Sequence, residues 1–210
     1  MIQKGILVVV SGFSGVGKGT LMKKLVEKYD DYALSISATT RDPREGETDG
    51  REYFFHTKEE FQKMIDQEEL VEYASYCDNF YGTPKKYVED QMRQGRDVIL
   101  EIEIQGALKI KAKYPDALLL FVMPPSAAEL KERLVGRGTE TEEVIAARLK
   151  RASEESDGME AYDYMLVNDR LEECVEQMHT LISAQRHRVN RNLEFIEKIR
   201  TEVKRFTKGE

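Results

Sequence analysis

The sequence predicts an α/β fold whose centre is a parallel sheet flanked by helices. Apolar runs at residues 6–10, 98–104 and 118–123 have the length and aliphatic content of buried strands, and a shorter fourth run covers residues 164–167. Helical patterns separate these runs along the chain. Strands that alternate with helices are typical of a parallel sheet, because a parallel connection needs a crossover long enough to hold a helix.

The stretch between the first two of these strands has a different texture. Short alternating segments at residues 51–55 and 70–76 lie among turn residues, and one helix is expected over residues 58–67. The start of that helix is locally specified, because the Thr57 side chain can cap the first turn and Glu60 can reach back to the cap. We therefore expect a small α+β subdomain inserted into the parallel core.

Two further helices are expected over residues 127–135 and 142–156, and Arg137 lies between glycines in the segment that joins them. Such a pair of helices can swing as a lid. Arg137 could equally be an ordinary turn residue. The expected organisation is a core over residues 1–33, the inserted subdomain over 34–97, core again over 98–126, the lid region over 127–157, and core with a long C-terminal helix over 158–210.

The end of the chain, residues 170–207, has no glycine or proline and is predicted to form one long helix with a capping box of Asp169 and Glu172. Two apolar rows run along it with a seven-residue repeat, and Gln185 and Asn192 interrupt the second row. This pattern indicates a coiled-coil seam and a homodimer or higher oligomer through the helix. The alternative is that the first half packs on the sheet and the second half is a solvated extension. The rows are Val175, Ile182, Val189, Ile196 and Val203, and Leu171, Met178, Ile199 and Phe206.

Composition limits the classes of partner. The chain has 210 residues, 40% of them apolar, which is enough for a buried core. Its net charge of -7 argues against general binding to nucleic acid, although residues 184–210 carry a net positive charge and could be a solvated face or a contact for RNA or a membrane. We expect a cytoplasmic protein with no membrane contact, because no stretch resembles a membrane span or a signal peptide. Cys77 and Cys174 suit neither a disulfide framework nor a zinc site.

A glycine-rich loop between Gly12 and Thr20 follows the first predicted strand and leads into a helical pattern. Glycines allow a tight turn there, and the unpaired N–H groups at the start of the next helix can face an anion. Lys18 adds a positive charge for the β and γ phosphates of a nucleoside triphosphate. The residues expected at this donor site are Ser14, Gly15, Val16, Gly17, Lys18, Gly19 and Thr20.

Gly19 departs from the usual form of this loop, in which a hydroxyl residue follows the lysine. Direct ligation of Mg²⁺ by the protein is therefore not expected. The ion would be held mainly by phosphate oxygens and by water, which Mg²⁺ gives up reluctantly.

A second grip for an anion is expected at Arg41 and Arg44, which flank the stiffening residue Pro43. Two guanidinium groups in this arrangement can hold phosphate oxygens with forked donors. Tyr53 and Tyr81 could add hydroxyl donors, although each could equally be a half-buried packing residue.

Taken together, these segments make the chain resemble the guanylate kinase family over nearly its whole length, up to about residue 185. The matching segments are the loop around Lys18 and residues 37–46, 50–55, 79–83, 99–106, 137–141 and 167–169. The resemblance implies the P-loop nucleoside monophosphate kinase fold, in which the inserted subdomain binds GMP and a helical lid closes over the substrates. It also implies transfer of the γ-phosphoryl group from ATP to GMP or dGMP, giving ADP and GDP, in purine nucleotide metabolism.

The resemblance also implies roles for individual residues. The phosphate of GMP would be held by Arg41, Arg44, Tyr53 and Tyr81, and guanine would be read by Ser37, Glu72 and Thr83 with Glu103 nearby. The family usually has aspartate in place of Glu103, which leaves a direct contact to the base open. Asn168 would contact the adenine of ATP or else cap the last helix. The cations expected to neutralise the transferring group, with no general base required, are Lys18, Arg41, Arg137 and Arg148.

The chemistry of guanine supports the role of Glu72 independently. A carboxylate can accept from N1–H and the 2-amino group of guanine together, whereas adenine has no N1 proton and would leave a buried Glu72 partly unpaired, at about 1–3 kcal/mol or more. The fold is also compatible with two other functions. A protein-binding scaffold module of the same fold typically lacks the phosphate loop. A related kinase for a sugar bisphosphate would leave Ser37, Glu72 and Thr83 without a base to read.

Overall fold

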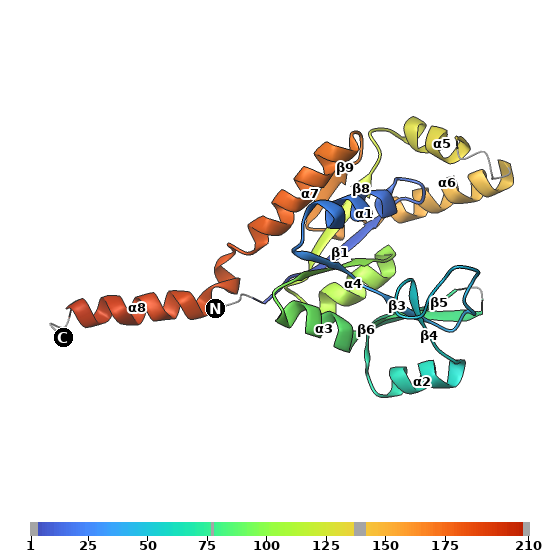
Figure 1. Cartoon of the computed structure of the whole chain (residues 1–210). Coiled ribbons are helices and arrows are strands. Elements are labelled where there is room, and N and C mark those ends of the chain that lie inside the picture. Colours follow the sequence, from blue (N-terminus) through green and yellow to red (C-terminus); the bar gives the residue numbers. More distant parts are fainter. Residues whose placement is uncertain (1–3, 77, 137–141, 208–210) are drawn as a thin grey trace.

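The computed structural model describes residues 4–76, 78–136 and 142–207, and its centre is a five-stranded parallel sheet (Figure 1). Each neighbouring pair of strands in this sheet runs parallel, as predicted. The strand order is β2 (Tyr32–Leu34), β7 (Asp97–Glu101), β1 (Leu7–Gly12), β8 (Leu118–Met123) and β9 (Tyr164–Val167). The edge strand β2 was not predicted, because three residues are too few to show a pattern.

The predicted strand over residues 98–104 is wrong at its end. β7 stops at Glu101, Glu103 is the extended N-cap residue of helix α4 (Ile104–Lys113), and Ile104 is already helical. The alternation of glutamate and isoleucine reads as one strand, but β1 pairs with β7 only as far as Glu101. The chain is therefore free to turn there, which places Glu101 and Glu103 at the carboxyl edge of the sheet.

Helices cover both faces of the central sheet. Val8 and Val10 of β1 pack in one apolar cluster with helices α1 (Lys18–Lys28) and α7 (Leu171–Gln185). Leu7 and Val9, which alternate with them, pack in a second cluster with α4 and with helix α3 (Lys85–Arg93). Because successive side chains of a strand point to opposite faces, the apolar run of β1 is buried on both sides.

The inserted stretch forms a second sheet of four strands, in the order β4 (Tyr53–Phe55), β3 (Ser37–Thr39), β6 (Asn79–Pro84) and β5 (Leu70–Tyr76). Helix α2 (Lys58–Asp66) lies against it, and its Phe61 is fully buried beside Ala38 and Leu70. The predicted capping box is confirmed, since the backbone N–H of Glu60 donates to Thr57 Oγ1 at 3.1 Å and the N–H of Thr57 donates to Glu60 Oε2 at 2.8 Å.

The expectation of a single helix between residues 34 and 97 is wrong, because α3 is also helical. α3 packs its Val88 into the cluster that holds Leu7 and Val9 of the central sheet rather than onto the second sheet. This helix was not predicted because the segment is mostly polar. Its buried residue is Val88, and one buried position is too little to show a helical repeat. The domain boundaries themselves stay an interpretation.

The first lid helix begins and ends where the sequence predicts, and the second ends where predicted. The residues just before Glu142 lie outside the described residues. α5 (Ala127–Val135) starts with the side chain of Ser126 accepting from the N–H of Glu129 at 3.1 Å, and α6 (Glu142–Ser156) packs against it. A short 3-10 turn, η1 (Met159–Ala161), leads from α6 into β9. Arg137 lies outside the described residues.

The prediction of a single long C-terminal helix is wrong. α7 ends at Gln185, a 3-10 turn η2 (Val189–Arg191) follows, and a separate helix α8 (Leu193–Thr207) extends away from the rest of the molecule (Figure 1). The amide of Asn192 explains part of the break, since its Nδ2 donates to the carbonyls of Arg186 and Arg188, both at 2.8 Å. These bonds replace helical ones without any glycine or proline.

The start of α7 also differs from the prediction. Its N-cap residue is Arg170 with no side-chain cap, so Asp169 and Glu172 form no capping box. The first-half residues of the repeat, among them Val175, Met178 and Ile182, are buried on the sheet, as in the alternative interpretation. In the second half Val203 and Phe206 are exposed.

Within the described residues, none of the helices combines the length and the apolar character needed to cross a membrane. Cys174 is a free and buried thiol, and burial raises its pKa to about 11. Cys77 lies outside the described residues.

Candidate functional site

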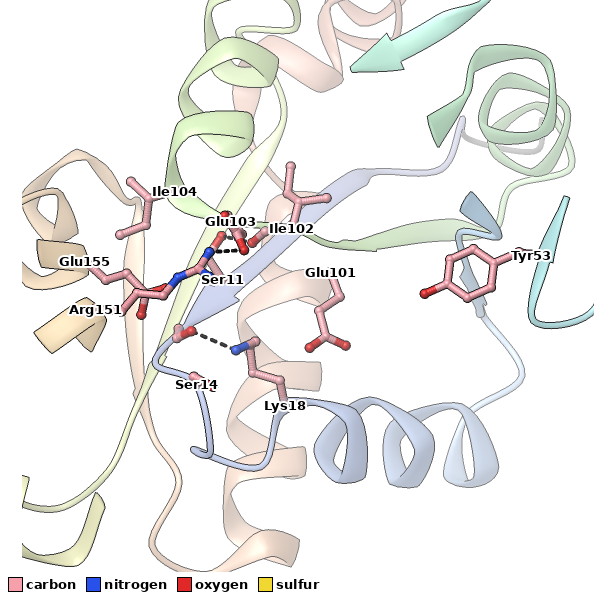
Figure 2. Close-up of a pocket in the computed structure, with 11 residues that line it drawn as sticks. Ser11, Ser14, Lys18, Tyr53, Glu101, Ile102, Glu103, Ile104, Arg151 and Glu155 are labelled. Atoms are coloured by element: carbon pink, nitrogen blue, oxygen red, sulfur yellow. Dashed lines mark hydrogen bonds and ion pairs between the residues drawn. The ribbon is translucent and has the colours of Figure 1, made fainter. Parts of the chain in front are cut away.

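A cavity of about 450 Å³ opens at the carboxyl edge of the central sheet, beside the glycine-rich loop. Figure 2 shows side chains of both charges pointing into it. Lys18 lies on one side, Glu101 comes from the end of β7, Glu103 is the N-cap residue of α4, and Arg151 and Glu155 come from α6. The hydroxyl of Tyr53, from the second sheet, faces the same space. Ligands commonly bind at this edge of a parallel sheet.

The loop backbone needs glycine at specific positions. Gly15 and Gly17 have φ of 88° and 93°, in the left-handed region, and a Cβ on Gly15 would lie 2.6 Å from Leu134 of α5. α1 starts directly after Gly17 with no side-chain cap and no acidic residue in its first turn. The N–H groups of that turn are therefore available for an anion.

Lys18 folds back over this loop. Its Nζ donates to the carbonyl of Gly12 at 2.7 Å and to that of Phe13 at 3.2 Å. Burial lowers the pKa of Lys18, and the nearby carboxylates of Glu101, Glu155 and Glu103 oppose that shift. The ammonium group of Lys18 donates to neutral carbonyls, and it can exchange them for phosphate oxygens because a hydrogen bond between two charged groups is stronger.

Asn168 braces the loop from the far side. The residue is 8% exposed, and its Nδ2 donates to the carbonyl of Val16 at 2.8 Å. A Cβ on Gly17 would lie 2.9 Å from the same Nδ2. The alternative that Asn168 caps the last helix is wrong, since Arg170 holds that position without a side-chain bond.

A second cavity of about 330 Å³ adjoins the first and reaches between the two sheets. The two cavities share Tyr53, Glu101 and Glu103 in their walls. The second one brings together five residues that the resemblance assigns to GMP, namely Ser37, Tyr53, Glu72, Tyr81 and Glu103.

Glu72 is the charged group in the wall of this second cavity that bonds to Thr83. The fully buried hydroxyl of Thr83 donates to Glu72 Oε1 at 2.8 Å. Burial raises the pKa of the Glu72 carboxyl, and the bond from Thr83 and the charge of Lys109 oppose this shift. An acceptor held in place in a half-buried wall can select a ligand that offers donors.

Arg41 and Arg44 lie in the loop before β4 rather than in the walls of the two cavities. Arg41 makes a forked pair with Glu47, with N–O distances of 3.0 and 2.9 Å, and its guanidinium lies over the Tyr53 ring at 5.3 Å. The Arg41 guanidinium holds the pKa of Glu47 below its ordinary value. Glu47 also accepts from the backbone N–H of Arg44 at 2.7 Å. Glu47 thus occupies the fork that the sequence assigns to a phosphate.

The lid contributes arginines from α6. Arg148 and Arg151 both lie on this helix, and Arg151 lines the first cavity, where it bonds to Glu103 and to Glu155. The sequence analysis missed Arg151 and Glu155. Their spacing was a usable signal, since residues 148, 151 and 155 fall on one face of the predicted helix.

Among the residues that the structure describes, His, Cys, Asp and Glu form no group of three or more that could hold a metal ion. Carboxylate oxygens suit Mg²⁺, however, and Glu101 and Glu103 stand in the wall of the first cavity. They could accept from the water shell of an ion carried on phosphate.

Comparisons with known proteins show the family of the chain. A sequence model described as guanylate kinase matches residues 4–185. The chain is 48% identical over 200 residues to the guanylate kinase of Caldanaerobacter subterraneus, covering 95% of this chain and 97% of that protein. It is 51% identical over 183 residues to the guanylate kinase of Oceanobacillus iheyensis, covering 87% and 89%. The crystal structure of guanylate kinase from Anaplasma phagocytophilum is similar with a TM-score of 0.72 at 33% identity, covering 92% of this chain and 94% of that one.

Proposed function

The chain belongs to the guanylate kinase family and is an ATP:GMP phosphotransferase, and we propose that the phosphoryl group crosses between its two adjoining cavities. ATP would place its phosphates in the first cavity and GMP its base in the second. The observation that carries this arrangement is the shared wall, because Tyr53, Glu101 and Glu103 line both spaces. Reacting groups bound on either side of one wall are close enough for direct transfer.

The donor end is assigned to the glycine-rich loop. Lys18 would leave the carbonyls of Gly12 and Phe13 for the β and γ phosphates, and the loop from Ser14 to Thr20 would supply backbone N–H donors. The transferring group spreads its charge over three oxygens. Fixed positive groups around it therefore lower the barrier, and the protein itself forms no covalent bond to the substrate.

The acceptor end is assigned to the second sheet and its loop. Glu72 and Thr83 are already bonded, and with Ser37 they would read guanine, whose N1–H and 2-amino group both donate. Tyr53 and Tyr81, with rings 6.1 Å apart, would bind the phosphate of GMP. Arg41 would join them by exchanging Glu47 for phosphate, and Arg44 follows in the same loop.

Closure of the lid completes the site in this proposal. Arg148 on α6 and Arg137 in the preceding segment would approach the transferring group and exclude water, which could otherwise accept it. Asn168 supports the loop through its bond to the carbonyl of Val16, and in this proposal it would also contact the adenine of ATP. Mg²⁺ would neutralise phosphate charge, held mainly by phosphate oxygens and water, with Glu101 and Glu103 close to that water shell.

We also propose a homodimer through α8, in the cytoplasm where both nucleotides are available, with no role in binding nucleic acid or membranes. α8 supports the dimer because it lies beyond the segment matched by the family and exposes apolar side chains, including Leu193, Phe195 and Val203. Exposed apolar patches of this kind commonly mark association surfaces.

The function is tested by offering GMP, dGMP, AMP, CMP and UMP separately with ATP and Mg²⁺ and following ADP release. We expect release with GMP, and a slower or equal rate with dGMP. Preference for AMP would overturn the assignment of Glu72, Ser37 and Thr83 to guanine. The absence of release with all five acceptors would favour a binding module over an enzyme.

A further inference from the structure

Arg151 joins the lid helix α6 to the core through an ion pair with Glu103. One end of its guanidinium bonds to Glu103, the N-cap residue of α4, and its Nε lies 3.3 Å from Oε1 of Glu155, one turn further along α6 (Figure 2). Its side chain is 42% exposed, and that of Glu103 is 70% exposed, whereas that of Glu155 is 17% exposed. The two carboxylates therefore hold Arg151 in different ways.

The bond to Glu103 is readily exchanged. An ion pair between exposed side chains is worth little in water, because solvent screens the charges and two long side chains must be ordered. Glu155, in contrast, lies on the same helix, has little exposed surface and fixes the stem of the guanidinium. A phosphate group entering the cavity would thus compete with Glu103 and leave Glu155 in place.

Arg151 and Lys18 face one space. Both line the first cavity, and they are close enough that the charge of Arg151 lowers the pKa of Lys18. Two cations that repel across a cavity both gain when an anion lies between them. A planar guanidinium is well matched to phosphate oxygens, since it presents its N–H donors as a rigid fork.

We propose that Arg151 is a phosphate-binding residue of the donor site, held over the cavity by Glu155 and paired with Glu103 until a nucleotide phosphate takes the place of Glu103. This proposal rests on the assignment of the donor phosphates to the first cavity. It adds a cation that reaches the nucleotide from the lid side, opposite Lys18. The pair of Arg151 with Glu103 is then the resting contact of the lid.

The competing interpretation is structural. Arg151 could simply tie α6 to the start of α4, and then removing either partner of the ion pair would weaken the site alike. The two interpretations predict opposite changes in nucleotide affinity when the charge of Glu103 is removed. If Glu103 competes with phosphate for Arg151, removing its charge should tighten nucleotide binding. If Glu103 is instead a structural tie, removing its charge should weaken it.

The experiment measures the Kd of ADP for the full chain by calorimetry, without GMP and without added divalent metal, so that neither guanine nor Mg²⁺ contributes. We expect Arg151→Gln to weaken ADP binding about tenfold, the range for a lost bond to a charged group. We expect Glu103→Gln to tighten it about twofold to fivefold, and we expect that gain to disappear when Arg151→Gln is also present. Lys150→Gln, on the exposed face of the same helix, is the matched control and should leave the Kd unchanged.

Thermal melting of each variant separates binding from folding, and Arg151→Lys keeps the charge if Arg151→Gln melts early. Weaker ADP binding in both single variants would support the structural tie and overturn the proposal. If the tighter binding of Glu103→Gln persists in the double variant, Glu103 acts only by repelling the phosphates of ADP, independently of Arg151. That result would also overturn the proposal. ADP binding is read without any acceptor, so failure of GMP phosphorylation in the intact protein would count against the proposed function alone.

Discussion

Thr83 Oγ1 donates a hydrogen bond of 2.8 Å to Oε1 of Glu72, across adjacent strands of the second sheet. The hydroxyl is fully buried, and the carboxyl that accepts it has a pKa raised by burial. One oxygen of Glu72 is thus engaged by the protein. The second oxygen is 3.7 Å from the position that a Cβ on Gly106 would take, so the glycine leaves room beside it. A ligand donor can occupy that room.

Glu72→Gln should raise the KM for GMP by about tenfold to a hundredfold, because hydrogen bonds to a charged acceptor are worth about 1.5–3 kcal/mol. The kcat should change less than the KM, since the base is remote from the transferring group. Glu69→Gln, an exposed position just before the same strand, is the control. Steady-state kinetics with GMP as the varied substrate checks this. A KM within twofold of the parent enzyme would remove Glu72 from the base site.

The raised pKa of Glu72 predicts a dependence on pH. Guanine donates to the ionised carboxylate, so GMP binding should weaken as the pH falls through a pKa that lies above the ordinary value of 4.5. The effect of pH on the stability of the protein runs in the opposite direction. The native state binds the proton more readily than the unfolded state, so the contribution of Glu72 to stability falls as the pH rises from 4.5 through the folded pKa.

Urea denaturation and GMP binding over a pH series measure both effects. Relative to Glu72→Gln, the parent protein should lose stability across that window as the pH rises. A free energy of unfolding that changes in parallel for the two proteins at every pH would contradict the shift.

Parts of the fold that depend on local patterns could be predicted from the sequence. The strand over 118–123 and the helix over 127–135 have the predicted ends, because a buried aliphatic run, a capping serine and Gly136 mark them. The capping box of Thr57 and Glu60 is equally local. The residues of the second cavity, such as Glu72, were reached through the resemblance to a family.

Features that depend on distant contacts could not be predicted. The end of α7 is tied to the sheet, since Arg186 pairs at 2.8 Å with Asp97, a residue 89 positions away and 2% exposed. Asn192 then bonds to carbonyls of the broken segment. The contact of Arg151 with Glu103 likewise joins helices far apart in the sequence. Helical propensity and heptad spacing contain no information about such partners.

Two glycines of the phosphate loop should respond differently to alanine. Gly17 has φ of 93°, and its Cβ would lie 2.9 Å from Asn168 Nδ2, whereas a Cβ on Gly19 would meet no atom within 4 Å. Gly17→Ala should therefore cost about 1–2 kcal/mol of stability for the left-handed backbone alone and should also weaken ATP binding. Gly19→Ala should be neutral or should stabilise α1 by up to about 1 kcal/mol.

Denaturant unfolding and ATP titration of the two variants check this contrast. Each serves as the control for the other, because both add one methyl group to the same loop. Equal losses in the two variants would mean that backbone conformation at Gly17 does not limit the loop.

The outer face of α8 combines exposed apolar side chains with separated charges. Phe206 is 82% exposed and Val203 is 54% exposed. Glu194 lies in the first turn, and Lys204 and Arg205 lie in the last. Two copies of α8 packed antiparallel would therefore bury both apolar faces and bring acidic turns opposite basic ones, an arrangement that sets partner and orientation in helix pairs.

Light scattering of the intact chain at micromolar concentration should accordingly give the mass of two chains. Ile199→Glu should return it to one chain, because a charge placed in the apolar row would be buried without a partner on association. Lys198→Glu places the same charge on the polar side of the helix, where Lys198 is 61% exposed, and should leave the dimer intact. Because α8 extends away from the rest of the molecule (Figure 1) and none of its residues lines either cavity, kcat should not differ between the two forms. A mass of one chain for the parent protein would show that the apolar row of α8 is solvated, and an intact dimer in Ile199→Glu would place the contact on another surface.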